Sequence, residues 1–132
     1  MSSSRLLKKK TEMTLREIRE ILQASVMCGE DRLDEEIRCA GASDLMSDVL
    51  AFGKPGLLLL TGLSNSQSVR TALIIDAKAI AYVRGKTPDS LGAQLAKEKG
   101  FPILSTELTM YKACGLLYSH GLPGVADLQE QD

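Results

Sequence analysis

Three apolar segments of the chain are each followed by a short polar loop whose side chains suit an anion or a nucleotide. The junctions read LLLLTGLSNS, AIAYVRGKTPDS and FPILSTELT. Hydroxyl, amide and cationic groups are common in them, and these groups donate hydrogen bonds to phosphate or carboxylate oxygens. The candidate ligand-binding residues are Thr61, Gly62, Ser64, Asn65, Arg84, Lys86, Ser105 and Thr106.

The first of these loops, residues 61–66, is the strongest candidate for ligand binding. Gly62 permits close backbone approach, and the helix expected to follow would present a partially positive N-terminus to a phosphate. Serine and asparagine are also common helix N-caps, so capping explains Ser64 and Asn65 as well. The loop matches neither the GxxxxGK[ST] nor the GxGxxG pattern, so neither a P-loop nor a dinucleotide fingerprint is indicated.

The other two loops each allow two interpretations. Arg84 and Lys86 place two cations where, with the hydroxyls of the first loop, they would clamp a phosphate or carboxylate. A solvated turn with Pro88 at the first helical position explains the same residues. Ser105 and Thr106 suit both the capping of the last helix and contact with a bound group.

Groups for catalysis or metal binding are sparse in this sequence. Cys28, Cys39, Cys114 and His120 have no compact metal-ligand spacing, and we expect the thiols to be reduced. The single histidine, His120, is interpreted as a helix C-cap and not as a general base. Asp44, Asp48 and Asp76 suit helix ends and faces as well as acid–base chemistry. We therefore nominate no catalytic residue, metal or cofactor, and we expect a protein that is not an enzyme.

Length and composition fit one domain in the cytoplasm. A chain of 132 residues with 44% hydrophobic residues is long enough to bury a core of its own. A formal net charge of -1 and few aromatic residues argue against a nucleic-acid surface. The longest aliphatic run, Leu57 to Leu60, is too short to span a membrane, and Ser2 to Lys10 lacks the apolar region of a signal peptide.

Strand-like and helix-like segments alternate along the chain, which favours crossover connections and a parallel sheet. Thr14 and Glu17 form a capping box at the start of the first helix. We predict an α/β fold, namely a single three-layer α/β/α domain with a largely parallel sheet of about five strands flanked by helices. The expected strands are 24–28, 36–42, 56–61, 79–83 and 102–105, and later helices are expected from Ser43 to Phe52 and over 67–75, 89–99 and 107–119.

The two ends of the chain differ in composition from its centre. Residues 1–12 are polar and contain the run Lys8-Lys9-Lys10, which predicts a disordered basic extension. Residues 123–132 contain Pro123 and end in acidic residues, which predicts a disordered acidic tail. The α/β domain itself is expected over residues 13–122.

Several of these segments together resemble a stand-alone DRTGG domain protein. The resemblance covers nearly all of the chain from Thr14 to about Leu122 and rests on five short segments. The chain has no Asp-Arg-Thr-Gly-Gly string, and the matching positions are Thr61-Gly62 and Val83-Arg84-Gly85. The segments that carry the resemblance are SDLMSDVLAF at 43–52, LTG at 60–62, VRTA at 69–72, VRGK at 83–86 and LST at 104–106.

The resemblance implies a regulatory module like those of CBS-type pyrophosphatases and phosphotransacetylases, with a fold similar to the N-terminal domain of HPr kinase/phosphorylase. It also implies a homodimer, an adenine nucleotide as ligand, and association with hydrogenase or other redox proteins. Our first hypothesis is a non-catalytic sensor domain that binds a small anionic ligand at the loops after its strands. The alternative is a protein-interaction module without a small ligand, docking on a redox or signalling partner through Leu45, Met46 and Val49.

Overall fold

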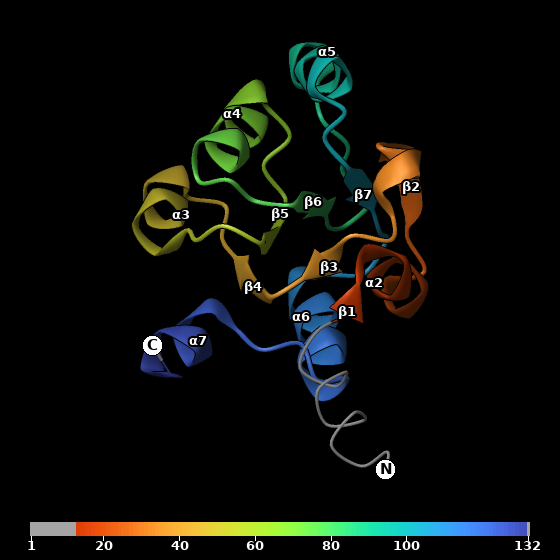
Figure 1. The fold of residues 1–132 in the computed structure, drawn as a ribbon. Coiled ribbons are helices and arrows are strands. Elements are labelled where there is room, and N and C mark those ends of the chain that lie inside the picture. The colour runs from red at the N-terminus through yellow and green to blue at the C-terminus, as the bar shows by residue number, and fades with distance from the viewer. Residues whose placement is uncertain (1–12, 132) are drawn as a thin grey trace.

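A five-stranded sheet with strand order β2-β7-β6-β5-β4 forms the centre of the fold (Figure 1). The computed structural model describes residues 13–131, so the expected basic extension over residues 1–12 lies outside the described residues. Each strand agrees with its predicted range to within about a residue, except that the second segment divides into two short strands. The sheet contains β2 (Ser25–Cys28), β4 (Cys39–Ala42), β5 (Leu57–Thr61), β6 (Ala79–Tyr82) and β7 (Ile103–Ser105).

The sheet is parallel apart from one edge strand. β4, β5, β6 and β7 lie side by side in the order of the sequence, and β2 joins the other side of β7 in antiparallel orientation. All residues of β5 and β6 are buried, as expected for strands with both faces covered. The prediction of a largely parallel sheet is therefore confirmed, and the carboxyl ends of four strands meet at one edge.

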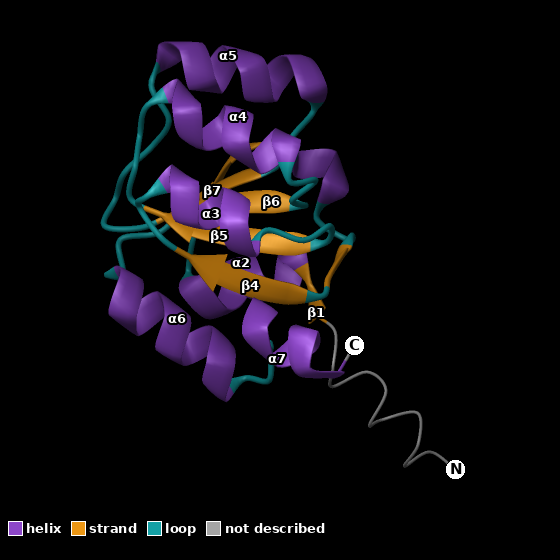
Figure 2. Ribbon diagram, turned by 90° about the vertical axis from the view of Figure 1, so that its left-hand side faces the viewer, coloured by secondary structure: helices purple, strands orange, loops and turns teal. Residues whose placement is uncertain are grey.

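Helices cover both faces of the sheet and complete the predicted three layers (Figure 2). The helices α3 (Met46–Phe52), α4 (Ser66–Ile74) and α5 (Ser90–Lys99) connect the parallel strands and lie on one face. The opposite face carries α2 (Leu15–Leu22) and α6 (Met110–Ser119). Three helices therefore cover one face, and two cover the other.

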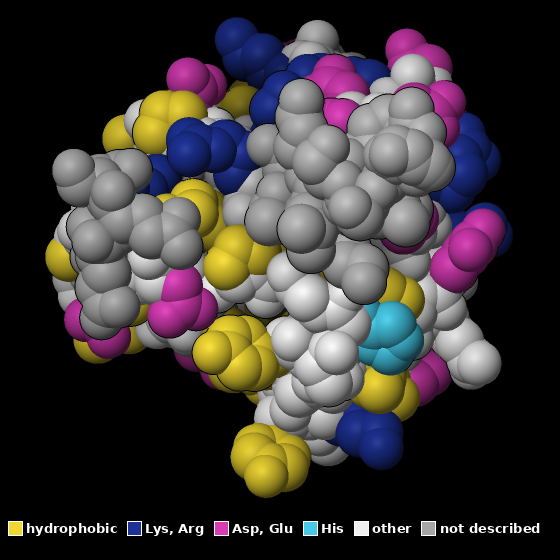
Figure 3. Space-filling view, turned by 60° about the horizontal axis from the view of Figure 1, so that its bottom comes forward, with side chains coloured by type: hydrophobic (Ala, Val, Ile, Leu, Met, Phe, Trp, Pro, Cys, Tyr) yellow, Lys and Arg dark blue, Asp and Glu magenta, His cyan; other side chains and the backbone are white. Residues whose placement is uncertain are grey.

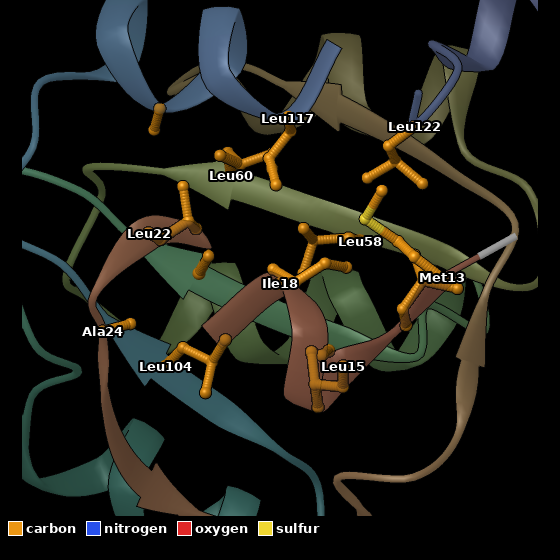
Figure 4. Close-up of a cluster of buried hydrophobic side chains, with 14 of the residues drawn as sticks. Met13, Leu15, Ile18, Leu22, Ala24, Leu58, Leu60, Leu104, Leu117 and Leu122 are labelled. Atoms are coloured by element: carbon orange, nitrogen blue, oxygen red, sulfur yellow. The ribbon is translucent and has the colours of Figure 1, made fainter. Parts of the chain in front are cut away.

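The core under α2 and α6 is made of aliphatic side chains (Figure 4). Leu15, Ile18 and Leu22 recur at helical spacing, so α2 buries one stripe against the sheet. They pack in one cluster with Leu58 of β5 and Leu104 of β7. Each such side chain is buried almost completely, which stabilises the fold by about 1.5–3 kcal/mol per residue.

Side-chain caps fix several helix starts that the sequence predicted. The capping box of Thr14 and Glu17 is present at α2, and Asn65 caps α4 by accepting a hydrogen bond from the amide of Gln67. Asp89 caps α5 through the amide of Gly92, so Pro88 lies outside the helix, and the interpretation that placed Pro88 at the first helical position is wrong.

Two other predicted starts were also wrong. The hydroxyl of Ser43 accepts a hydrogen bond from the amide of Leu45, a local turn that delays the start of α3. Thr109 caps α6 in place of Ser105 or Thr106. The predicted C-cap is confirmed, since the ring nitrogen Nδ1 of His120 lies 2.7 Å from the carbonyl oxygen of Leu116.

The structure differs from the expectation for the end of the chain. A disordered tail was expected over residues 123–132, but α7 (Val125–Gln131) follows a β-bridge between Gly124 and Ala40. The amide of Ala40 donates to the carbonyl of Pro123, and the side chain of Val125 is buried. Residues 123–125 pack against the edge of β4 that pairs with no other strand of the five-stranded sheet. The composition of the segment does not indicate this contact. At the other end, β1 (Met13–Thr14) pairs with β3 (Glu36–Ile37).

Candidate functional site

The predicted ligand-binding residues follow β5, β6 and β7 at the carboxyl edge of the sheet. The connections after β5 and β6 lead to helices on one face, whereas β7 is followed by α6 on the other. Open α/β sheets bind ligands where neighbouring connections diverge in this way. In this protein the two diverging loops are joined by hydrogen bonds. The amide of Gly85 donates to the carbonyl of Thr106 at 2.8 Å, and the hydroxyl of Ser105 donates to the carbonyl of Lys86 at 2.6 Å.

A carboxylate that the sequence analysis considered for acid–base chemistry, but not for the ligand site, contacts the first loop. Asp44 follows β4 directly, and its Oδ1 accepts hydrogen bonds from the hydroxyl of Thr61 at 3.1 Å and from the amide of Gly62 at 2.6 Å. The Thr61 hydroxyl in turn accepts from the amide of Leu63. Two donors considered for an anion are therefore engaged by Asp44. Its position after a strand is the same signal that identified the other loops.

Arg84 adopts a backbone conformation that is unusual for its residue type. Its φ is 56°, in the left-handed region, and its amide donates to the carbonyl of Leu108 at 2.8 Å. A non-glycine residue in this region is strained by about 1–2 kcal/mol. The conformation places the guanidinium Nη2 3.0 Å from the position that a Cβ would take at Gly62. Strain of this kind is common at functional sites, so Arg84 is the residue of this edge that most needs a functional explanation.

The eight predicted residues differ in which of their groups remain available. Arg84 and Lys86 are exposed, and among residues 13–131 neither makes an ion pair. Within that same part of the chain the hydroxyl of Ser64 has no hydrogen-bond partner. Thr61 and Thr106 are buried, and the hydroxyl of Thr106 donates to the carbonyl of Leu22. Direct contact with a ligand is therefore open to the side chains of Ser64, Asn65, Arg84 and Lys86, whereas the hydroxyls of Thr61, Ser105 and Thr106 make hydrogen bonds within the protein.

No protein-family model matches the sequence, and the comparison with curated proteins finds no match. A solved structure does match, namely the CBS and DRTGG domains of the regulatory region of Clostridium perfringens pyrophosphatase, complexed with its activator diadenosine tetraphosphate. The TM-score is 0.69 at 19% identity, over 96% of this chain. The fold is that of a DRTGG-like domain. The chain spans 54% of the length of that structure, so the comparison covers about half of the regulatory region.

A buried hydroxyl pair supports the strained loop of this DRTGG-like fold. The hydroxyl oxygens of Tyr82 and Ser68 lie 2.7 Å apart, which joins the last residue of β6 to the first turn of α4. Burial raises the pKa of the Tyr82 phenol, so it stays protonated and able to donate. The pair holds the end of β6 in place shortly before Arg84. No local sequence pattern indicates this contact between Tyr82 and Ser68.

The described residues of the DRTGG-like domain provide no metal site and no membrane span. Across residues 13–131, no three histidine, cysteine or acidic side chains come together to hold a metal ion. Cys28, Cys39 and Cys114 are free thiols whose pKa is raised by burial. None of the described helices is long and apolar enough to cross a membrane.

The apolar patch expected for protein docking is not formed as predicted. Leu45 is 59% exposed, but Met46 and Val49 of α3 are buried, with exposed fractions of 3% and 0%. A different hydrophobic surface exists between β4 and α6, where a cavity of about 500 Å³ opens to solvent. Periodicity identified the apolar face of α3 but not which residues of that face meet the sheet.

Proposed function

We propose that this chain is a non-catalytic regulatory domain that binds a small anionic ligand of the adenine nucleotide class at the carboxyl edge of its sheet. Arg84 and Lys86 supply positive charge, Ser64 supplies a hydroxyl donor, and the amide-rich loops after β5 and β6 position them. Two exposed cations without an ion pair among the described residues suit the oxygens of a phosphate chain.

The strained backbone of Arg84 is the observation that carries this proposal. Glycine would adopt a φ of 56° without strain, and the following residue, Gly85, does so at 70°. An arginine at this position costs stability, as do Gln23 and Asp76 at similar φ values, and a use of the guanidinium in binding would explain why arginine stands at this edge. Arg84 lies next to Gly62, whose missing side chain leaves room for the guanidinium.

Support for the ligand class comes from the matching regulatory region, whose structure contains diadenosine tetraphosphate as an activator. The chain shares the fold of that region but not its length, so the nucleotide is part of the proposal. A cytoplasmic location, a homodimeric state and an association with hydrogenase or another redox enzyme also stay predictions.

Isothermal titration calorimetry of the full chain tests the proposal. The panel contains AMP, ADP, ATP, diadenosine tetraphosphate, adenosine and tripolyphosphate. The expected result is saturable binding of at least one adenine nucleotide that weakens with salt, as charge pairing at an exposed site requires. Binding of adenosine with the same affinity as its phosphorylated forms would contradict a site built on cations.

A further inference from the structure

An open cavity of about 500 Å³ lies beside α6. β4 and Leu60 of β5 form its floor, α6 forms its wall, and residues 122–124 bound one end. None of the eight predicted ligand-binding residues lines it, so it is separate from the proposed nucleotide site. Its volume lies within the range of small-molecule sites, about 300–1,000 Å³. Figure 3 shows this side of the molecule, where exposed hydrophobic side chains in yellow gather near the cyan His120.

Small residues on the edge strand leave the floor of the cavity low. Ala40 and Ala42 of β4 point to the face that α6 covers, since Gly41 between them lies against Phe52 on the opposite face. The neighbouring strand presents the larger side chain of Leu60 on the same face as the two alanines. The sheet is therefore hollow at this edge, where leucines fill the space at its centre.

Gly115 keeps the helix wall of the cavity open as well. It lies in the interior of α6, where glycine is less favourable than alanine. It lines the cavity, and a Cβ built at this position would meet nothing within 4 Å. The fold itself therefore does not require a glycine here, and its presence preserves a space that a side chain would occupy.

The lining of the cavity is apolar with a single charge. Leu117 and Leu122 line it together with Leu60, and Figure 4 shows these three side chains on the side of β5 that faces α6. Lys112 is the charged residue among the lining side chains, and no acidic residue lines the cavity. Within residues 13–131 Lys112 makes no ion pair. The cavity is therefore complementary to a molecule with an apolar body and one negative charge.

Lys112 and a backbone donor lie at the same end of the cavity. α6 follows β7, so its first turn, which contains Lys112, lies at the carboxyl edge of the sheet. Ala42 is the last residue of β4 and reaches the same edge. The amide of Ser43 donates to the carbonyl of Leu60 in β5, so the amide of Ala42 points the other way, toward the open side of β4. A carboxylate at this end would meet both a cation and an amide.

We propose that this cavity binds a carboxylate with a slender apolar chain, of the medium-chain fatty acid class, at a site separate from that of the nucleotide. The carboxylate pairs with Lys112 and accepts a hydrogen bond from the amide of Ala42. The apolar chain lies along Leu60 and Leu117 toward Leu122. Binding removes the apolar floor and wall of the cavity from water, which is the main source of affinity.

The shape and charge of the cavity favour this occupant. The lining residues of α6 extend from Tyr111 to Tyr118, about 10 Å along the helix axis, so the apolar wall is long enough for an extended alkyl chain. Residues 1–12 of the chain itself are basic and would bring like charge to Lys112. A small anionic amphiphile satisfies both the length of the wall and its single cation.

Calorimetry of the full chain with octanoate, nonanoate and decanoate, each below its critical micelle concentration, tests this inference. Each added methylene should strengthen binding about fourfold, because it is buried against the apolar wall. Decanoate should bind at least about tenfold more tightly than decyltrimethylammonium, which carries the opposite charge on the same chain. Equal affinity for these two amphiphiles, or an affinity that does not rise with chain length, would overturn the inference.

Two substitutions locate the site within the chain. Lys112→Met keeps an apolar stem but removes the charge, and it should weaken decanoate binding at least about fivefold. Lys99→Met makes the same change at an exposed residue of α5 and leaves the affinity unchanged.

Gly115→Leu fills the cavity and should weaken decanoate binding at least about tenfold. It should also raise the melting temperature, because leucine is the better helix former, so the loss of binding is not a loss of folding. Unchanged decanoate binding by Gly115→Leu, or an equal loss in Lys112→Met and Lys99→Met, would overturn the inference. So would a Gly115→Leu variant whose self-association changes while its decanoate affinity does not, since the face would then bind protein.

Discussion

The guanidinium of Arg84 lies against the backbone of Gly62, with Nη2 3.0 Å from the point that a Cβ would occupy there. The same point lies 3.5 Å from Oδ1 of Asp44. A cation, a carboxylate and a glycine from three different loops therefore meet at the carboxyl edge of the sheet. This relationship gives the proposed site its charge and sets the substitutions that test it.

Replacing Arg84 separates its cost to the fold from its contribution to binding. Arg84→Ala and Arg84→Gly both remove the guanidinium, but only glycine relieves the left-handed backbone. We expect Arg84→Gly to exceed Arg84→Ala in free energy of unfolding by about 1 kcal/mol, measured by urea denaturation. Both variants lose nucleotide affinity to the same extent. Equal stability of the two would show that the backbone at residue 84 is not strained.

Changes at Asp44 test whether the ligand is an anion. Asp44→Asn keeps an oxygen for the amide of Gly62 and removes a negative charge from the edge, so nucleotide affinity should rise about threefold to tenfold. Asp44→Ala instead leaves the donors of Thr61 and Gly62 without this acceptor and should cost about 1–3 kcal/mol of stability. Weaker nucleotide binding by Asp44→Asn would indicate that the carboxylate itself contacts the ligand.

Thr106 is expected to act on the loop and not on the ligand. Its hydroxyl donates to the carbonyl of Leu22 at 2.7 Å and accepts from the amide of Leu108. Thr106→Val should lower the free energy of unfolding by about 1–3 kcal/mol, because both backbone groups lose a partner. Thr106→Ser keeps the hydroxyl and serves as the control. Thermal unfolding and calorimetry together check that stability falls and that affinity does not.

The ion pairs of Glu35 predict a dependence of stability on pH. Hydrogen bonds from Arg32 and Lys78, at 2.9 and 3.0 Å, hold the pKa of this carboxyl below its ordinary value. A lowered pKa contributes stability above the ordinary pKa of glutamate and loses it as pH falls through the folded value. Glu35→Gln should therefore cost about 0.5–1 kcal/mol near neutral pH, and this cost should disappear as pH falls through the lowered pKa of the folded state.

Urea denaturation of wild type and Glu35→Gln over a pH series measures this difference. Glu98→Gln, an exposed residue of α5 without an ion pair among residues 13–131, is the matched control. A difference in the free energy of unfolding between wild type and Glu35→Gln that stayed constant down to low pH would show that packing, and not charge, causes the loss of stability.

Local patterns predicted the elements of this fold well. The continuous apolar runs Leu57–Thr61 and Ala79–Tyr82 are strands buried on both faces, as expected in a sheet that helices cover on both sides. Thr14 caps α2 because Glu17, three residues later, completes the capping box. The predicted start of a helix was wrong where the expected capping side chain takes part in a nearby turn instead. At Ser43, for example, the hydroxyl accepts a hydrogen bond from the amide of Leu45.

The parts that sequence reasoning missed depend on contacts between distant residues. Asp44 meets Gly62 across 18 positions, and Thr106 meets Leu22 across 84. No local spacing encodes such pairs, so the sequence did not connect Asp44 with Gly62, although its place after a predicted strand was visible, and it left the hydroxyl of Thr106 open to a cap or a ligand. The conformation of Arg84 is also set by its loop contacts and is not visible from its residue type.

The central claim is that the cations after β6 bind an anionic nucleotide, and calorimetry of paired variants tests it most directly. Arg84→Ala combined with Ser64→Ala should weaken the tightest nucleotide of the panel at least about tenfold. Lys99→Ala removes the same charge near the end of α5, at the opposite edge of the sheet, and should leave affinity unchanged. Undiminished nucleotide binding by the double variant, or an equal loss in Lys99→Ala, would contradict the proposed site.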